Sequence, residues 1–107
     1  MPELTDQPEV VVTADLHDPT TPVIALAGEL DRATAKATRE AVHGYLSDQT
    51  ARVVFDLEKL TFMDSSGIAL LVQISNDVGT VTLIRVAPIV HRVLEATGLL
   101  EHFGLTP

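Results

Sequence analysis

Two adjacent serines, Ser65 and Ser66, are the residues whose position in the sequence best suits chemistry. They stand between Asp64 and Gly67, after an apolar segment typical of a strand and before one typical of a helix. A helix N-terminus presents unpaired backbone N–H groups and the positive end of the helix dipole, and both favour negative charge. A phosphate on Ser65 would be tolerated there and would change the surface that a partner meets. The pattern predicts a phosphorylation-controlled binding module.

Each residue of this segment also has a simpler structural interpretation. Ser65 could be a helix-capping hydroxyl, which contributes about 1 kcal/mol. We interpret Ser66 as a cap or helper beside the phosphoacceptor. Gly67 either permits the close approach of a partner or allows a tight start to the helix. Asp64 either meets the partner or is a second helix-capping acid.

A serine hydrolase is the main enzymatic alternative, and the sequence argues against it. A nucleophile elbow requires Gly-x-Ser-x-Gly, and here Met63 stands where the first glycine should be. The four histidines lie in no recognisable triad context, and none pairs with an acid at metal-ligand spacing. There is no cysteine, which excludes disulfides and thiolate sites. We therefore predict no catalytic residue, no metal and no cofactor.

Composition limits the partners and the compartment. The chain has 107 residues and a formal net charge of −8, and its seven Lys and Arg are scattered along the sequence. Binding to a nucleic-acid backbone needs clustered cations, so we expect no direct nucleic-acid contact. The acidic N-terminus is unlike a signal peptide, and no apolar run is long enough to cross a membrane. We expect a cytoplasmic protein with a flexible tail over residues 1–8 and one domain over residues 9–107.

Apolar periodicity and turn residues predict seven elements in the order β-β-α-β-α-β-α. The four strands are expected over residues 10–14, 23–30, 52–57 and 81–86. Asp31 is expected to cap the first helix, which buries Thr38, Ala41, Val42, Tyr45 and Leu46, contains Gly44 and ends within residues 47–50. The second helix is expected over residues 66–78. Pro88 opens the third, with Ile89, Val90, Val93 and Leu94 inward, and Gly98 ends it. A last edge strand is possible over residues 102–105.

This order predicts an α/β fold: a mixed, mostly parallel sheet of four to five strands with three or more helices packed on it. Strands separated by helices imply right-handed crossovers. The continuous apolar run of the third strand is expected of a strand with both faces covered. The loop after the second strand should lie at the same end of the sheet as the two serines. Glu29, Asp31 and Arg32 are therefore candidates for the rim of a partner site.

Three separate segments resemble the STAS domains of bacterial anti-sigma factor antagonists. Residues 53–71 (VVFDLEKLTFMDSSGIALL) resemble the signature of that family. Residues 28–35 (GELDRATA) resemble its segment before the first helix, and residues 87–99 (APIVHRVLEATGL) resemble its closing helix. The three matches occur in the family's order and cover nearly the whole chain, from about Glu9 to Leu105. The resemblance implies the STAS fold.

The resemblance also implies a function. Such proteins bind an anti-sigma factor, commonly a serine kinase with an ATP-binding fold of the histidine-kinase type, and thereby free the sigma factor. The kinase phosphorylates the first hydroxyl after the aspartate, which corresponds to Ser65, and this ends the binding. A PP2C-type phosphatase reverses the mark. As an alternative, STAS domains serve as accessory or scaffold subunits of lipid-transport ATPases and stress-signalling assemblies, in which this serine is often absent or altered.

Overall fold

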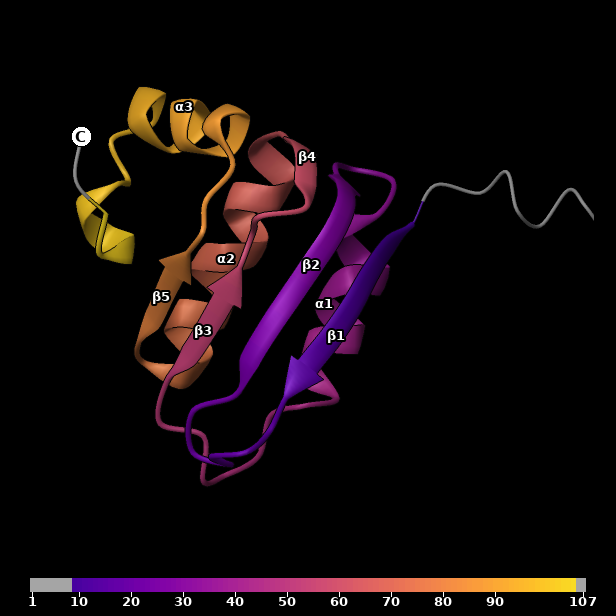
Figure 1. Ribbon diagram of the computed structural model, residues 1–107, viewed down its shortest axis with the longest axis vertical. Coiled ribbons are helices and arrows are strands. Elements are labelled where there is room, and N and C mark those ends of the chain that lie inside the picture. Colours follow the sequence, from indigo (N-terminus) through magenta and orange to yellow (C-terminus); the bar gives the residue numbers. More distant parts are fainter. Residues whose placement is uncertain (1–8, 106–107) are drawn as a thin grey trace, which may run out of the picture.

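A five-stranded mixed sheet is the framework of the fold (Figure 1). The computed structural model describes residues 9–105, so the predicted tail over residues 1–8 lies outside the described part. The elements are β1 (Val10–Asp15), β2 (Val23–Leu30), α1 (Ala35–His43), β3 (Val53–Asp56), β4 (Leu60–Met63), α2 (Ser65–Val78), β5 (Val81–Ile84), α3 (Pro88–Ala96) and the 3-10 helix η2 (Glu101–Phe103). The strand order is β1-β2-β3-β5, with β4 also paired to β2. Only the β1–β2 pair is antiparallel. The predicted α/β architecture is confirmed.

Both crossover helices lie on one face of this sheet. The chain moves from β2 to β3 through α1 and then to β5 through α2, always in the same direction across the sheet. Right-handed crossovers made in one direction place their helices on the same side. Figure 1 shows α1 and α2 behind the sheet, α3 beside one end of it, and no helix among residues 9–105 on the opposite face. Our expectation that both faces of β3 are covered is therefore wrong, and Val54 on the open face is only partly buried.

Strand β2 changes partner along its length, and this creates a strand that we did not predict. Its first residues pair with β3, and Gly28–Leu30 pair with β4 after a register shift at Gly28. Gly28 has a φ of +125°, and a Cβ there would lie 2.8 Å from the backbone oxygen of Glu9. Glycine is therefore required at this kink. Because Leu30 pairs with Met63, α2 starts next to the end of β2.

The core fills the space between the sheet and its helices with aliphatic side chains and two phenylalanines, Phe55 and Phe103. The stripe that we predicted for the first helix is partly wrong. Thr38 and Val42 are buried as expected, but Ala41 lies in α1 off the face that they form and is exposed. The helix ends at the cap Gly44, so Tyr45 and Leu46 lie beyond it, and Tyr45 is exposed. In α3, Pro88 opens the helix as predicted, but Ile89 is 42 % exposed.

The predicted edge strand over residues 102–105 is also wrong. Residues 101–103 form η2, which buries the ring of Phe103 completely, and Gly104 ends it in the left-handed conformation. A helical turn brings this ring over β5, which an extended edge strand would not do. None of the described helices is long and apolar enough to span a bilayer.

Candidate functional site

Asp64 fixes the start of α2, where the two serines lie. Its backbone N–H donates to the carbonyl oxygen of Leu30 at 3.3 Å, which ties the helix start to the end of β2. Its carboxylate accepts from the backbone N–H of Ser66 at 2.8 Å, so Asp64 is the N-cap. An aspartate at this position satisfies an otherwise unpaired donor and complements the helix dipole. Of the two roles considered for Asp64, the capping role is thus seen directly.

Because Asp64 performs the capping, the hydroxyls of both serines are left free. Ser65 is the first residue of α2 and is exposed, and Ser66 is half-buried. Neither hydroxyl makes a hydrogen bond to any other residue within residues 9–105. Ser65 is therefore not the helix-capping hydroxyl of the structural alternative. It presents an unengaged nucleophilic oxygen at the positive end of a fourteen-residue helix.

Gly67 is buried and faces inward rather than toward a partner. A Cβ on Gly67 would lie 2.5 Å from Cγ of Met63, 2.9 Å from its Sδ and 3.0 Å from Cγ of Leu30. The first turn of α2 therefore packs directly against β4 and β2. Of the two interpretations of this glycine, the geometry supports the close start of the helix.

The loop after β2 lies beside these serines, as the topology led us to expect. The carboxylate of Asp31 accepts from the backbone N–H groups of Ala33 (2.9 Å) and Thr34 (3.1 Å). The buried hydroxyl of Thr34 donates to the carbonyl oxygen of Glu29 at 2.8 Å. Asp31 thus caps a turn that precedes α1, rather than the helix itself. The side chains of Glu29 and Arg32 are exposed at this end of the sheet.

A groove with basic residues runs from this loop along the interface of α1 and α2. It has a volume of about 290 Å³. Arg32, Lys36 and Arg39 line one wall, and Ser66 and Gln73 line the other. Arg39 donates to Oε1 of Gln73 at 2.7 Å. The sequence did place these cations at helical spacing, but we interpreted the charge as scattered, so Lys36, Arg39 and Gln73 were missed.

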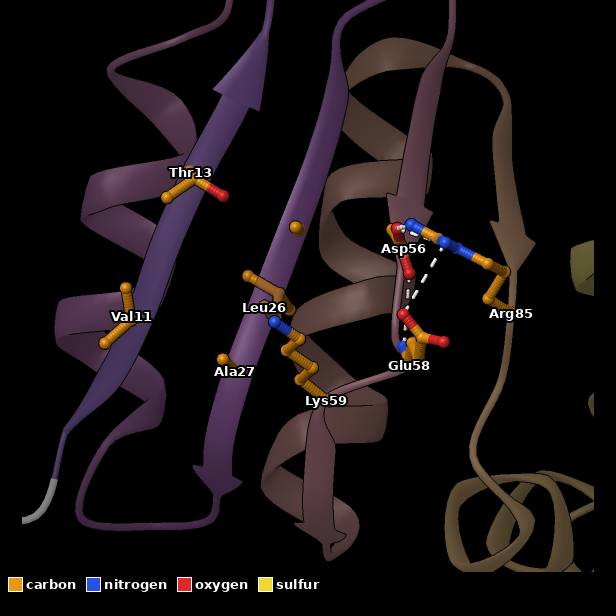
Figure 2. A pocket seen from close by; sticks show the side chains of 9 residues that line it. Val11, Thr13, Leu26, Ala27, Asp56, Glu58, Lys59 and Arg85 are labelled. Carbon is orange, nitrogen blue, oxygen red and sulfur yellow. Dashed lines mark hydrogen bonds and ion pairs between the residues drawn. The ribbon is translucent and has the colours of Figure 1, made fainter.

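A second hollow, of about 310 Å³, lies on the open face of the sheet (Figure 2). Asp56 at the end of β3 is buried there, and its carboxylate accepts from two guanidinium nitrogens of Arg85 and, at 3.1 Å, from the backbone N–H of Glu58. The Arg85 guanidinium holds the pKa of Asp56 below its usual value. None of the predicted site residues lines this hollow. The ion pair of Asp56 and Arg85 was missed because the two residues are 29 positions apart in the sequence.

Within residues 9–105, no group of three or more His, Asp or Glu side chains is arranged to hold a metal ion. Polar side chains line at least three hollows among residues 9–105. The first is the basic groove that flanks the α2 start, the second is the open-face hollow, and the third, of about 470 Å³, lies beside His43, Asp48 and Asp77. The predicted site residues Glu29, Asp31, Arg32, Asp64, Ser65, Ser66 and Gly67 all lie at or beside the α2 start, next to the first hollow.

Comparison with known proteins gives consistent matches. The sequence profile of the STAS domain matches residues 8–107. An anti-sigma F factor antagonist from Paenibacillus polymyxa is 32% identical over 84 residues, which cover 74% of this chain and 72% of that protein. The crystal structure of an anti-sigma factor antagonist from Mycobacterium paratuberculosis is similar with a TM-score of 0.76 and 27% identity, over 92% of this chain and 86% of the other. The antagonist SpoIIAA in its unphosphorylated form matches with a TM-score of 0.72 and 26% identity, over 83% and 82% of the two chains.

Proposed function

The chain belongs to the STAS domain family, and on this basis we propose that it is an anti-sigma factor antagonist controlled by phosphorylation of Ser65. In this proposal the unphosphorylated protein binds an anti-sigma factor with serine kinase activity and so releases a sigma factor. The kinase phosphorylates Ser65, and a PP2C-type phosphatase removes the phosphate. The protein acts in the cytoplasm as a binding partner and not as an enzyme.

The free hydroxyl of Ser65 is the observation that carries this proposal. It is exposed and bonded to nothing in the described part of the chain, and Asp64 already caps the helix that follows. A kinase can therefore modify this oxygen without breaking a bond that supports the fold. The relatives named as anti-sigma factor antagonists supply the class of partner.

A phosphate on Ser65 would act on the interface rather than on the fold. It adds about −1.5 to −2 charges at neutral pH. In the free protein this charge faces solvent at the positive end of α2, where it is stabilised. In a complex it must be desolvated beside the carboxylate of Asp64. If this costs on the order of 3 kcal/mol, affinity falls by roughly a hundredfold.

The test is a paired capture from the native cytoplasm with tagged Ser65→Ala and Ser65→Asp proteins, followed by affinity measurement with the purified partner. We expect Ser65→Ala to retain a small ATP-binding kinase and Ser65→Asp to bind it roughly a hundredfold more weakly. Thr80→Asp is a matched control, because it adds the same charge at an exposed position beyond the other end of α2. Equal affinity of the Ser65→Asp and Thr80→Asp proteins would refute the switch.

A transport or scaffold role is the competing proposal within the same family. In that case both Ser65 variants would retain a transport ATPase or a large assembly, and phosphorylation of Ser65 would have no effect on binding. The free hydroxyl favours the switch, because a purely structural serine at this position is expected to bond to the backbone of the helix start.

A further inference from the structure

The basic groove between α1 and α2 is formed by an unusual concentration of positive charge. The whole chain has seven Lys and Arg against fifteen Asp and Glu. Three of those seven, Arg32, Lys36 and Arg39, line this one groove, and no Asp or Glu of the described residues lines it. None of the three forms an ion pair with a carboxylate in the part of the chain that the structure describes. The groove is thus a cationic strip on an acidic protein.

The local energetics of α1 do not favour this arrangement. Lys36 lies in the first turn of α1, where the helix dipole favours acidic side chains, and that turn has no acidic residue. Lys36 and Arg39 are also three residues apart on one face, where like charges repel. Only Arg39 has a structural contact here, its hydrogen bond to Gln73, whereas the side chains of Arg32 and Lys36 make no hydrogen bond or ion pair among residues 9–105. The position of Arg32 and Lys36 is therefore explained better by something that they bind than by the stability of the fold.

We propose that this groove is a docking surface for an acidic peptide segment of the partner protein. The inference rests on the proposed function, since the groove is lined by Ser66, the residue next to the proposed phosphorylation site Ser65. The groove offers guanidinium and ammonium donors to carboxylates along its wall. The small side chains of Ala35 and Ala69 also line it, so an extended backbone can approach closely.

Phosphorylation of the adjacent serine would act on this surface too. A phosphate at the mouth of the groove adds negative charge next to the segment that the cations would hold, and it neutralises part of their field. The acidic segment would then be repelled from the groove that attracts it in the unphosphorylated protein. The groove therefore gives the switch a second electrostatic contribution besides desolvation at Ser65.

The experiment is a titration of the ¹⁵N-labelled full chain with an acetylated, amidated peptide of about ten residues in which glutamate and alanine alternate, followed by amide chemical shifts. We expect the shifts to concentrate in residues 32–39 and 66–73 and to weaken with added salt. Arg32→Gln/Lys36→Gln should weaken binding at least about tenfold without lowering the melting temperature. Arg52→Gln/Lys59→Gln removes the same charge from exposed positions outside the groove and should bind the peptide normally.

Shifts that spread over the whole surface, or that persist in Arg32→Gln/Lys36→Gln, would overturn the proposal. So would inorganic phosphate shifting the same amides under conditions in which the peptide does not, because the groove would then recognise a phosphoryl group. The titration uses only this protein and the synthetic peptide, without a kinase, so its result does not depend on phosphorylation of Ser65. If the switch alone fails, Ser65→Asp will leave partner affinity intact while the groove still binds the peptide.

Discussion

At the level of single residues, the site divides two tasks between neighbouring side chains. Asp64 supplies the oxygen that caps α2, and its backbone N–H is held by Leu30. This leaves the hydroxyl of Ser65 exposed and without a hydrogen bond among the described residues. In a serine that itself capped the helix, phosphorylation would change the group that makes the capping contact. The capping aspartate therefore separates the stability of the helix start from the modification state of the serine.

Substitution of Asp64 tests this division of tasks. Asp64→Ala removes the acceptor for the Ser66 N–H and should lower the free energy of unfolding by about 1 kcal/mol in denaturant titration. Asp64→Asn keeps a capping oxygen, so it should be almost as stable as the wild type. Any loss of partner affinity in Asp64→Asn can then be attributed to the loss of the negative charge of Asp64. A loss of stability as large in Asp64→Asn as in Asp64→Ala would contradict the capping role.

The pair of Asp56 and Arg85 predicts a dependence of stability on acid. Hydrogen bonds from Arg85 lower the pKa of Asp56 from its ordinary value of 3.8, against the opposing effect of burial. A carboxylate whose pKa is lowered by folding stabilises the native state at pH values above its ordinary pKa of 3.8. This contribution is lost as the pH falls through the folded-state pKa. Asp56→Asn should therefore unfold more readily than the wild type at pH about 7, and the difference should close in acid. A difference that is the same at both pH values would show that the charge is not responsible.

At the level of elements, the sequence predicted most of the strands and helices but missed two short ones, β4 and η2. The strand β2 and the helices α2 and α3 have clear periodicity and clear boundary residues, and they lie where expected. Strand β4 has only four residues, and its buried positions, Leu60 and Met63, do not alternate. Its existence depends on the kink at Gly28, which frees the end of β2 for a new partner. Such pairing is a tertiary event that local patterns do not report.

The C-terminal segment is a second case in which tertiary packing decides the structure against a local sequence pattern. Phe103 and Leu105 alternate as in a strand, but residues 101–103 form a helical turn that contacts β5 and buries the ring of Phe103 completely. For the candidate site, the sequence indicated the serines, Asp64 and the loop after β2, because their neighbourhood follows from topology alone. It did not indicate Lys36, Arg39 and Gln73, because the groove exists only once α1 and α2 pack together.

Gly67 allows a prediction about how closely α2 must pack. Gly67→Ala adds a Cβ that overlaps Met63, a side chain held between β4 and α2. We expect the free energy of unfolding to fall by about 1–3 kcal/mol, in spite of the higher helix propensity of alanine. Gly44→Ala is a suitable control, because Gly44 has a helical φ of −62° and the new Cβ meets no side chain, only the backbone oxygen of Ala41 at 3.3 Å. If both variants unfold at the same denaturant concentration, the close contact at Gly67 is not important.

At the level of the whole molecule, the candidate site is separate from the hydrophobic core and lies at one end of the sheet. Parallel strands β2 and β4 finish together, and the hydrogen bond from Asp64 to Leu30 joins the helix start to the sheet. The serines, the loop after β2 and the groove residue Arg32 all lie at this end. Charges added here can alter binding without disturbing the core, because none of the free hydroxyls supports it.

This separation predicts that modification leaves the fold unchanged. Amide hydrogen exchange of Ser65→Asp should match that of the wild type in the sheet and in the body of α2, and differences should be confined to about the first turn of the helix. Its melting temperature should be equal or slightly higher, since an acidic residue at the first position of α2 complements the helix dipole. Asp64→Ala is the contrasting control, because loss of the cap should increase exchange along the start of α2. Faster exchange throughout the sheet in Ser65→Asp would mean instead that the charge works by loosening the domain, and an interface mechanism would then be wrong.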